Sequence, residues 1–182
     1  MHSFTTERLL IRPLIAEDET FFCQQLTNKK VMRYTGGTLV LDEASKVFQR
    51  SLRANKRAKN GGKKSVLTWA ILCLKTEAII GTQTLSFLVL PHNAEIIQQA
   101  EVKGIKQAEI GIVLKSEFQE KCIGKEAIEA LVKYGFHSLT LGQINAFYAD
   151  KNIASRKLFT SSNFTLSTTS PLKTSDYSHQ YI

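Results

Sequence analysis

No Cys-x-x-Cys pair occurs in this sequence, and its three cysteines, Cys23, Cys73 and Cys122, are odd in number and widely spaced. This pattern argues against a disulfide framework and against a thiolate zinc site. The four histidines are scattered without ligand-like spacing, so we expect no metal site. Reduced thiols are typical of cytosolic proteins, which predicts a cytoplasmic location.

Long apolar runs are missing as well. No run approaches the ~20 residues that a membrane helix needs, and residues 1–8 lack the basic and then apolar order of a signal peptide. The chain holds only three prolines, with no internal repeat and no low-complexity linker. We therefore expect no membrane contact and one domain over residues 1–182, a length that suits a single compact domain.

Acidic residues are absent between Glu43 and Glu77, although the chain as a whole carries a net charge of +8. Within that gap, residues 53–64 hold six basic side chains. A basic surface attracts anions, so phosphate-bearing ligands and ribosomal or other RNA are both candidate partners. The alternative is a solvated helix end followed by a glycine loop. The sequence leaves these interpretations open.

Hydrophobic periodicity alternates between strand-like and helix-like segments, which favours a mixed α/β domain. Alternating or short β-branched segments predict strands at 9–12, 65–74, 78–89, 108–114 and 144–148, and a C-terminal hairpin from 164–167 and 177–182. Helical spacing predicts helices at 16–27, 42–59, 123–139 and 152–161, with Asp42 capping the second. Residues 90–106 interrupt the pattern and predict a loop with one short helix at most.

A strand, a short loop and an amphipathic helix follow one another from Glu109 to Ala127. The loop brings consecutive backbone N–H groups to a helix N-terminus, where they and the helix dipole can bind phosphate oxygens. Gly124 lets the backbone approach a ligand closely, and Lys121 and Lys125 add positive charge. The alternative is that the glycine merely turns the chain.

This segment resembles the acetyl-coenzyme A motif of the GNAT N-acetyltransferases, whose loop reads Gln/Arg-x-x-Gly-x-Gly/Ala. Gln119 fits the first position and Gly124 the last, but Cys122 replaces the middle glycine. Residues 152–159, with Asn163-Phe164 downstream, resemble the family's Asn-x-x-Ser/Ala-x-x-Leu-Tyr block, which usually closes with Gly-Phe.

The opening residues, Thr6-Glu7-Arg8-Leu9-Leu10-Ile11-Arg12-Pro13, are similar to the branch that acetylates the N-termini of ribosomal proteins, as is Glu109-Ile110-Gly111. The resemblance covers nearly the whole chain and is weakest at residues 90–106 and after Thr165. It implies a GNAT fold, with a central, mostly antiparallel twisted sheet flanked by helices, in which the fourth and fifth strands separate around the cofactor.

The resemblance also implies which residues bind acetyl-coenzyme A. Backbone groups of Ile112, Val113 and Leu114 would bind the pantetheine arm, and Asn152 and Ser155 would contact the cofactor near its amide region. Backbone amides of the loop and of the first helical turn would hold the pyrophosphate: Gln119, Glu120, Lys121, Cys122, Ile123, Gly124 and Lys125.

Two residues are predicted to be catalytic. Glu109 would take a proton from the amine, directly or through water, although an ordinary polar strand-end residue is the alternative. Many family members use a tyrosine at the position of Phe159 to protonate the departing thiolate. A phenyl ring cannot donate a proton, so Ser155 is the substitute, unless it serves only as a cofactor contact or a helix-surface residue.

The predicted reaction transfers an acetyl group from acetyl-coenzyme A to a primary amine by direct attack in a ternary complex. A protein N-terminal α-amine is the leading acceptor, and a small-molecule amine is the nearest rival. A coenzyme A-binding domain without catalysis and an RNA- or ribosome-docking module, with contact through residues 53–64, are alternatives of other classes. We expect a monomer or a homodimer.

Overall fold

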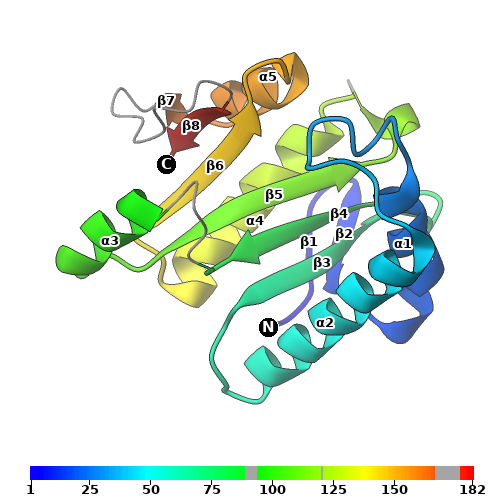
Figure 1. Ribbon diagram of the computed structural model, residues 1–182, viewed down its shortest axis with the longest axis horizontal. Coiled ribbons are helices and arrows are strands. Elements are labelled where there is room, and N and C mark those ends of the chain that lie inside the picture. The colour runs from blue at the N-terminus through cyan, green and yellow to red at the C-terminus, as the bar shows by residue number, and fades with distance from the viewer. Residues whose placement is uncertain (89–93, 120, 167–176) are drawn as a thin grey trace.

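The computed structural model describes residues 1–88, 94–119, 121–166 and 177–182 (Figure 1). Its strands are β1 (Phe4–Thr5), β2 (Leu9–Pro13), β3 (Val66–Cys73), β4 (Ile79–Ser86), β5 (Gln107–Leu114), β6 (Gln143–Ala149), β7 (Thr165–Leu166) and β8 (Tyr177–Tyr181). Its α-helices are α1 (Glu19–Thr27), α2 (Leu41–Lys59), α3 (Ala94–Val102), α4 (Ile123–Leu139) and α5 (Ile153–Ser161). Single 3₁₀ turns lie at Ala16–Asp18 and Ser116–Phe118.

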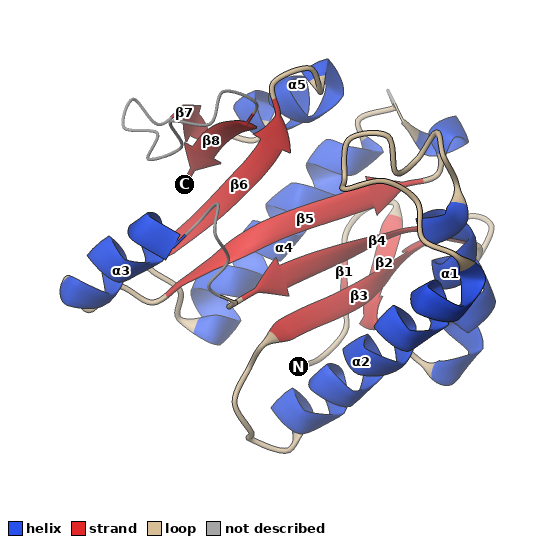
Figure 2. Ribbon diagram, viewed as in Figure 1, coloured by secondary structure: helices blue, strands red, loops and turns tan. Residues whose placement is uncertain are grey.

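The strands form one open sheet in the order β1-β2-β3-β4-β5-β6-β8-β7. Every neighbouring pair is antiparallel except β5 and β6, which run parallel. Helices α1 and α2 cover one face of the sheet, and α4 lies against the other (Figure 2). The expected fold class, a mostly antiparallel sheet flanked by helices, is confirmed.

The sheet separates two hydrophobic layers because successive side chains of a strand point to opposite faces. On β3, Leu67, Trp69 and Ile71 lie in the layer beneath α4, whereas Ala70 packs with Phe48 beneath α1 and α2. All five side chains are fully buried. Trp69 is thus a core residue, as its alternating position in the sequence predicts.

Most predicted elements are confirmed. Helix α4 matches its predicted bounds, the C-terminal hairpin is present as β7 paired with β8, and α3 supplies one short helix within residues 90–106. The predicted cap of α2 is wrong: the helix begins at Leu41 with Val40 as its N-cap, and Asp42 lies inside the first turn. Its carboxylate there still complements the helix dipole and pairs with Lys46 at 2.5 Å.

Across the part of the chain that the structure describes, no helix is both long and apolar enough to cross a membrane. The same residues bring no three His, Cys, Asp or Glu side chains together in a way that could hold a metal ion.

Candidate active site

Strands β5 and β6 are paired only at their beginnings. Their parallel ladder joins Gln107 to Gln143, Ala108 to Ile144 and Glu109 to Asn145, and the strands then separate (Figure 1). Beyond that point β5 remains paired with β4 on one side, and β6 with β8 on the other. The facing edges of the two strands therefore present backbone groups that have no partner strand, which a bound molecule can satisfy.

Amide side chains fix the closed end of this gap. Asn145, only 3% exposed, donates from Nδ2 to Oε1 of Gln107 at 2.6 Å and accepts from Nε2 of Gln143 at 2.7 Å. The backbone N–H of Gly142 donates to the carbonyl of Lys106 at 2.7 Å. The bonds to Gln107 and Lys106 cross between the two strand ends, and the bond from Gln143 orients Asn145 within β6, so the point of separation is set by side chains as well as by the ladder.

The gap contains a cavity of about 540 Å³. Its wall is built from the α1–α2 connection, from β4, β5 and β6, and from α5. The lining residues are Tyr34, Thr35, Gly36, Thr82, Thr84, Glu109, Ile110, Gly111, Ile112, Val113, Phe147, Tyr148, Asn152, Ser155 and Phe159. Gly111 keeps this wall close to β4, because a Cβ atom there would lie 2.9 Å from Oγ1 of Thr84.

The predicted site residues fall into two groups. Glu109, Ile112, Val113, Asn152 and Ser155 line the cavity together. The rest lie past the open end of β5: Leu114 at the strand end, Gln119, Lys121 and Cys122 in the loop, and Ile123, Gly124 and Lys125 in the first turn of α4. The side chains of Leu114 and Ile123 are buried in the core, and Glu120 lies outside the described residues.

The loop before α4 leads to a helix N-terminus without a side-chain cap. The N-cap residue Cys122 makes no capping bond, and the first N–H groups of a helix have no intrahelical partner. The backbone donors at Ile123, Gly124 and Lys125 are therefore the groups on which the predicted phosphate contact depends. Gln119 ties the loop to the end of β5, since its Nε2 donates to the carbonyl of Leu114 at 3.1 Å.

Both positions at which the family's glycines are missing keep a left-handed backbone. Cys122 has φ 59° and ψ 5°, and Asn163, where Gly-Phe is usual, has φ 64°. Asparagine adopts this region readily, whereas cysteine incurs a cost of about 1–2 kcal/mol. Both residues therefore adopt a backbone conformation that glycine favours at such positions.

Asn152 and Ser155 are joined at the start of α5. Asn152 is the N-cap, and its Oδ1 accepts from the backbone N–H of Ser155 at 3.2 Å. That bond orients the amide, and its Nδ2 group can donate to a ligand. The Ser155 hydroxyl lies one turn into the helix, on the side that lines the cavity.

Phe159 closes the inner side of the cavity. It is 4% exposed, stacks on the Tyr148 ring at 5.8 Å with an interplanar angle of 14°, and meets the edge of Phe164 at 5.1 Å. The hydroxyl oxygen of Tyr148 is itself fully buried. These rings give the cavity an apolar wall, and Ser155, Tyr34 and three threonines are among the hydroxyl-bearing residues of the rest of its lining.

Sequence reasoning missed the residues that α1 and its following connection contribute. Gln25, 5% exposed, accepts from Oγ1 of Thr82 at 3.0 Å and donates to the carbonyl of Val113 at 3.2 Å. It thereby joins α1 to two lining strands. Tyr34 precedes Gly36 and Gly37, which both have positive φ. In the sequence, the only indication of this part of the cavity wall was an aromatic residue, Tyr34, shortly before a pair of glycines between two predicted helices.

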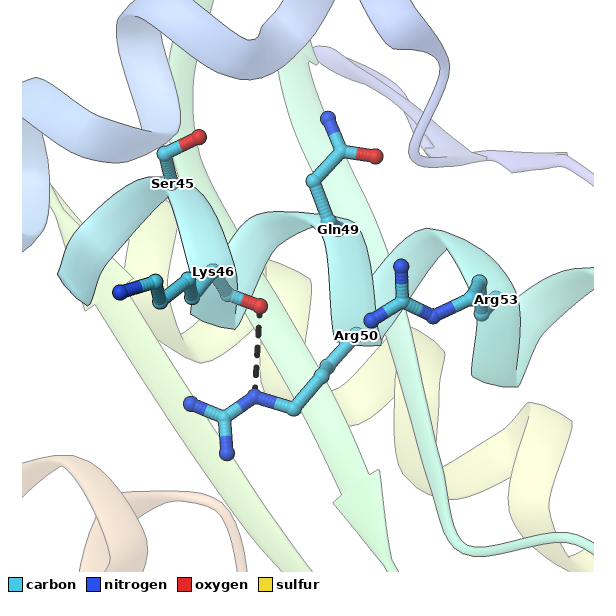
Figure 3. A pocket seen from close by; sticks show the side chains of 5 residues that line it. All are labelled: Ser45, Lys46, Gln49, Arg50 and Arg53. Carbon is cyan, nitrogen blue, oxygen red and sulfur yellow. Dashed lines mark hydrogen bonds between the residues drawn. The ribbon is translucent and has the colours of Figure 1, made fainter. Parts of the chain in front are cut away.

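A second hollow, of about 500 Å³, lies on the outer side of α2 (Figure 3). Its residues, Ser45, Lys46, Gln49, Arg50 and Arg53, recur at helical spacing. Arg50 donates from Nε to the carbonyl of Lys46 at 3.2 Å. The hollow overlaps the predicted basic segment only at Arg53, so the basic surface begins earlier on the helix than residues 53–64 indicate.

A family model described as an acetyltransferase (GNAT) domain matches residues 8–165. The chain therefore belongs to the GNAT acetyltransferase family, as its loop and its separated strands indicate. An uncharacterised N-acetyltransferase of Bacillus licheniformis, p20, is 27% identical over 164 residues, which cover 90% of this chain and 83% of that protein.

Solved structures share the fold at lower identity. The spermidine N-acetyltransferase of Vibrio cholerae, in complex with coenzyme A and spermine, has a TM-score of 0.72 and 18% identity, with 97% of this chain and 96% of that chain covered. A Salmonella typhimurium acetyltransferase that modifies the N-terminal serine of a 50S ribosomal subunit protein has a TM-score of 0.74 and 16% identity, with 97% and 95% covered.

Proposed function

We propose that residues 1–182 act as one cytoplasmic domain that transfers an acetyl group from acetyl-coenzyme A to a primary amine. The separation of β5 and β6 after only three residue pairs carries this proposal, because it opens a lined cavity between two strand edges. Family membership supports the same reaction class. The coenzyme A complex of the structural neighbour from Vibrio cholerae supports the cofactor.

The residues present fit acetyl-coenzyme A. The pantetheine arm would follow the exposed edge of β5 at Ile112 and Val113, and the pyrophosphate would meet the backbone donors that begin α4. The carbonyls of Val113 and Leu114 already accept from Gln25 and Gln119. The arm would bind the backbone groups that face the gap, such as those of Ile112, and a carbonyl that already accepts one bond can accept a second. Asn152 would donate from Nδ2.

The chemistry requires a neutral amine beside the thioester. At pH 7 roughly a tenth of an α-amine is neutral, against well under a thousandth of a lysine amine. Glu109 would accept the proton that the amine loses as the N–C bond forms. The C–S bond then breaks, and Ser155 would supply a proton to the departing thiolate. A backbone N–H of β5 would stabilise the oxyanion at the acetyl carbonyl.

The cavity favours a protein N-terminus over a polyamine as acceptor. Among the lining residues that the structure describes, Glu109 is the sole carboxylate, whereas a ligand with several ammonium groups is best held by several carboxylates. An α-amine needs one base and little activation. A small-molecule monoamine remains the alternative acceptor. The left-handed Cys122 and Asn163 support cofactor binding, which a working enzyme and a domain that binds without catalysis both require.

The decisive experiment is calorimetric titration with acetyl-coenzyme A, followed by mass analysis of a panel of peptides and small amines. Acetylation at peptide α-amines would support the leading acceptor, and acetylation of small amines alone would favour the alternative. Tight binding of acetyl-coenzyme A with no acetylated product would indicate a domain that binds the cofactor without catalysis. Absence of binding would overturn the proposal.

The basic face of α2 is proposed as a contact for ribosomal RNA. Arg50 and Arg53 are exposed beside the hollow, and guanidinium groups bind phosphates in a forked geometry.

We expect the double variant Arg50→Ala/Arg53→Ala to flatten the slope of log affinity against log salt by about 2, because two phosphates would no longer be neutralised. Fluorescence polarisation with a labelled RNA measures this slope, with Lys157→Ala on α5 as control. An unchanged slope would remove α2 from the contact.

A further inference from the structure

The opening residues Thr6 to Arg8 resemble the family but have no part in the chemistry above. They form the turn between β1 and β2, which closes with a bond from the Thr6 N–H to the Leu9 carbonyl at 2.9 Å. The Leu9 N–H in turn donates to Oγ1 of Thr6 at 3.0 Å. Two hydrogen bonds therefore close the turn, and the side chains of Thr6 and Arg8 extend from it to another element.

That element is the start of α4, more than a hundred residues later in the chain. Thr6 donates from Oγ1 to Oε1 of Glu126. The Arg8 N–H donates to the same oxygen at 2.9 Å, and the Arg8 Nε donates to Oε2 at 2.6 Å. One carboxylate in the first turn of α4 thus accepts three bonds from one turn of the N-terminal segment.

Arg8 also reaches the loop itself. Its Nη1 donates to the carbonyl of Lys121 at 3.1 Å, the residue just before the left-handed Cys122. The Cys122 carbonyl accepts from the N–H of Glu126 at 3.1 Å. The bond from Glu126 to Cys122 is the first backbone bond of α4, so it is Arg8 that ties the loop to the turn through a side chain, next to the left-handed Cys122.

Charge gives these contacts a second effect. Glu126 places a carboxylate in the helical turn where the backbone donors would meet phosphates, and an unpaired negative charge there would repel them. The Arg8 guanidinium neutralises it at 2.6 Å. Lys125, on the same turn, lies 3.7 Å from Glu129 and so faces a different carboxylate.

We propose that Thr6, Arg8 and Glu126 form a brace that sets both the conformation and the charge of the phosphate-binding loop, with Arg8 as its positioning residue. This inference rests on the proposed function, since it takes residues 119–125 to bind the phosphates of acetyl-coenzyme A. The brace acts on the phosphate end of the cofactor and not on the thioester.

Two ligands distinguish an effect on binding of the phosphate end from an effect on binding of the thioester end. S-acetyl-pantetheine carries the thioester and the arm but not the diphosphate, so it does not use the loop. We expect Arg8→Ala to weaken acetyl-coenzyme A roughly ten- to a hundredfold, the range for loss of hydrogen bonds to a charged group. Its affinity for S-acetyl-pantetheine should stay within about threefold of the original. Calorimetry, with competition for the weaker ligand, gives both constants.

Glu43→Gln is the matched control for Glu126→Gln, because Glu43 also lies in the first turn of a helix, α2, and contacts neither Thr6 nor Arg8 among the described residues. The Glu126→Gln protein should resemble Arg8→Ala, and the Glu43→Gln protein should resemble the unchanged chain. Equal loss for both ligands in Arg8→Ala would mean general destabilisation and overturn the brace. So would unchanged affinity for both. If the unchanged chain binds no acetyl-coenzyme A, the proposed function itself fails.

The brace also predicts a pH dependence of stability. Burial alone would raise the pKa of Glu126, but the bonds from Thr6 and Arg8 and the Arg8 charge hold it below its ordinary value of 4.5. A carboxyl with a lowered pKa stabilises the fold above its unfolded pKa, and this contribution is lost as pH falls through the folded value. The difference in melting temperature between the unchanged chain and Glu126→Gln should be constant above about pH 5 and shrink below about pH 4. A difference that persists unchanged at pH 3 would contradict this.

Discussion

Replacing Gly124 with phenylalanine is expected to weaken acetyl-coenzyme A binding by about a hundredfold or more. A Cβ atom at this position would lie 3.3 Å from Cδ1 of Leu158 and 3.5 Å from Cδ1 of Leu114. A ring attached there has to separate α4 from α5 and from the end of β5. Such overpacking costs about 1–3 kcal/mol, and here the displaced backbone is the one that carries the phosphate donors.

Gly124→Ala is the matched control. A single methyl group requires the Leu158 side chain to move by only a few tenths of an ångström, and alanine favours the helix by about 1 kcal/mol over glycine. This variant should bind the cofactor almost normally. Gly124→Val provides an intermediate size if the phenylalanine variant fails to fold, which circular dichroism detects. Unchanged affinity in a folded valine or phenylalanine variant would show that residues 119–125 do not form the phosphate site.

Replacing Ser155 with alanine is expected to lower kcat by about a hundred- to a thousandfold, within the range that a general acid contributes. Affinity for acetyl-coenzyme A should change by less than about threefold, because the lost hydroxyl would act on the departing thiolate. The substitution keeps the bond from the residue 155 N–H to Asn152, since that donor is backbone. The cap of α5 and the shape of the cavity are therefore preserved.

Ser161→Ala controls for the loss of a serine from the same helix. Its hydroxyl bonds to the Leu158 carbonyl at 2.8 Å and is not part of the cavity lining. A thiol-release assay at saturating cofactor, with calorimetry in parallel, separates turnover from binding. If Ser155→Ala turns over as fast as Ser161→Ala, Ser155 is no proton donor, and a binding loss without a turnover loss would make it a cofactor contact only.

Local patterns were sufficient to predict most of this fold. The apolar spacing of residues 123–139 defines α4 at both ends because one face of that helix is buried over its whole length. The same logic places β5 and α5 and so brings Glu109, Asn152 and Ser155 to one cavity. The cap of α2 was predicted wrongly since Asp42 and the true cap, Val40, are two residues apart, a difference that periodicity does not resolve.

The parts that sequence could not predict depend on contacts between distant residues. Nothing near Arg8 indicates Glu126 as its partner, and a glutamine in a helix such as Gln25 normally faces solvent. In the sequence, Cys122 and Asn163 depart from the family pattern, which has glycine at both positions. Only backbone angles show that both positions remain left-handed. The roles of these residues toward a ligand stay predictions until binding is measured.

The short ladder between β5 and β6 divides the sheet mechanically. On one side β1 to β5 form a continuous antiparallel unit, and on the other β6, β8 and β7 form a second one. Within the sheet, three residue pairs connect them. A molecule bound across the gap would add cross-links at the place where the sheet is weakest. Ligand occupancy would then govern how cooperatively the unit of β6, β8 and β7 unfolds, by linkage of binding to the folded state.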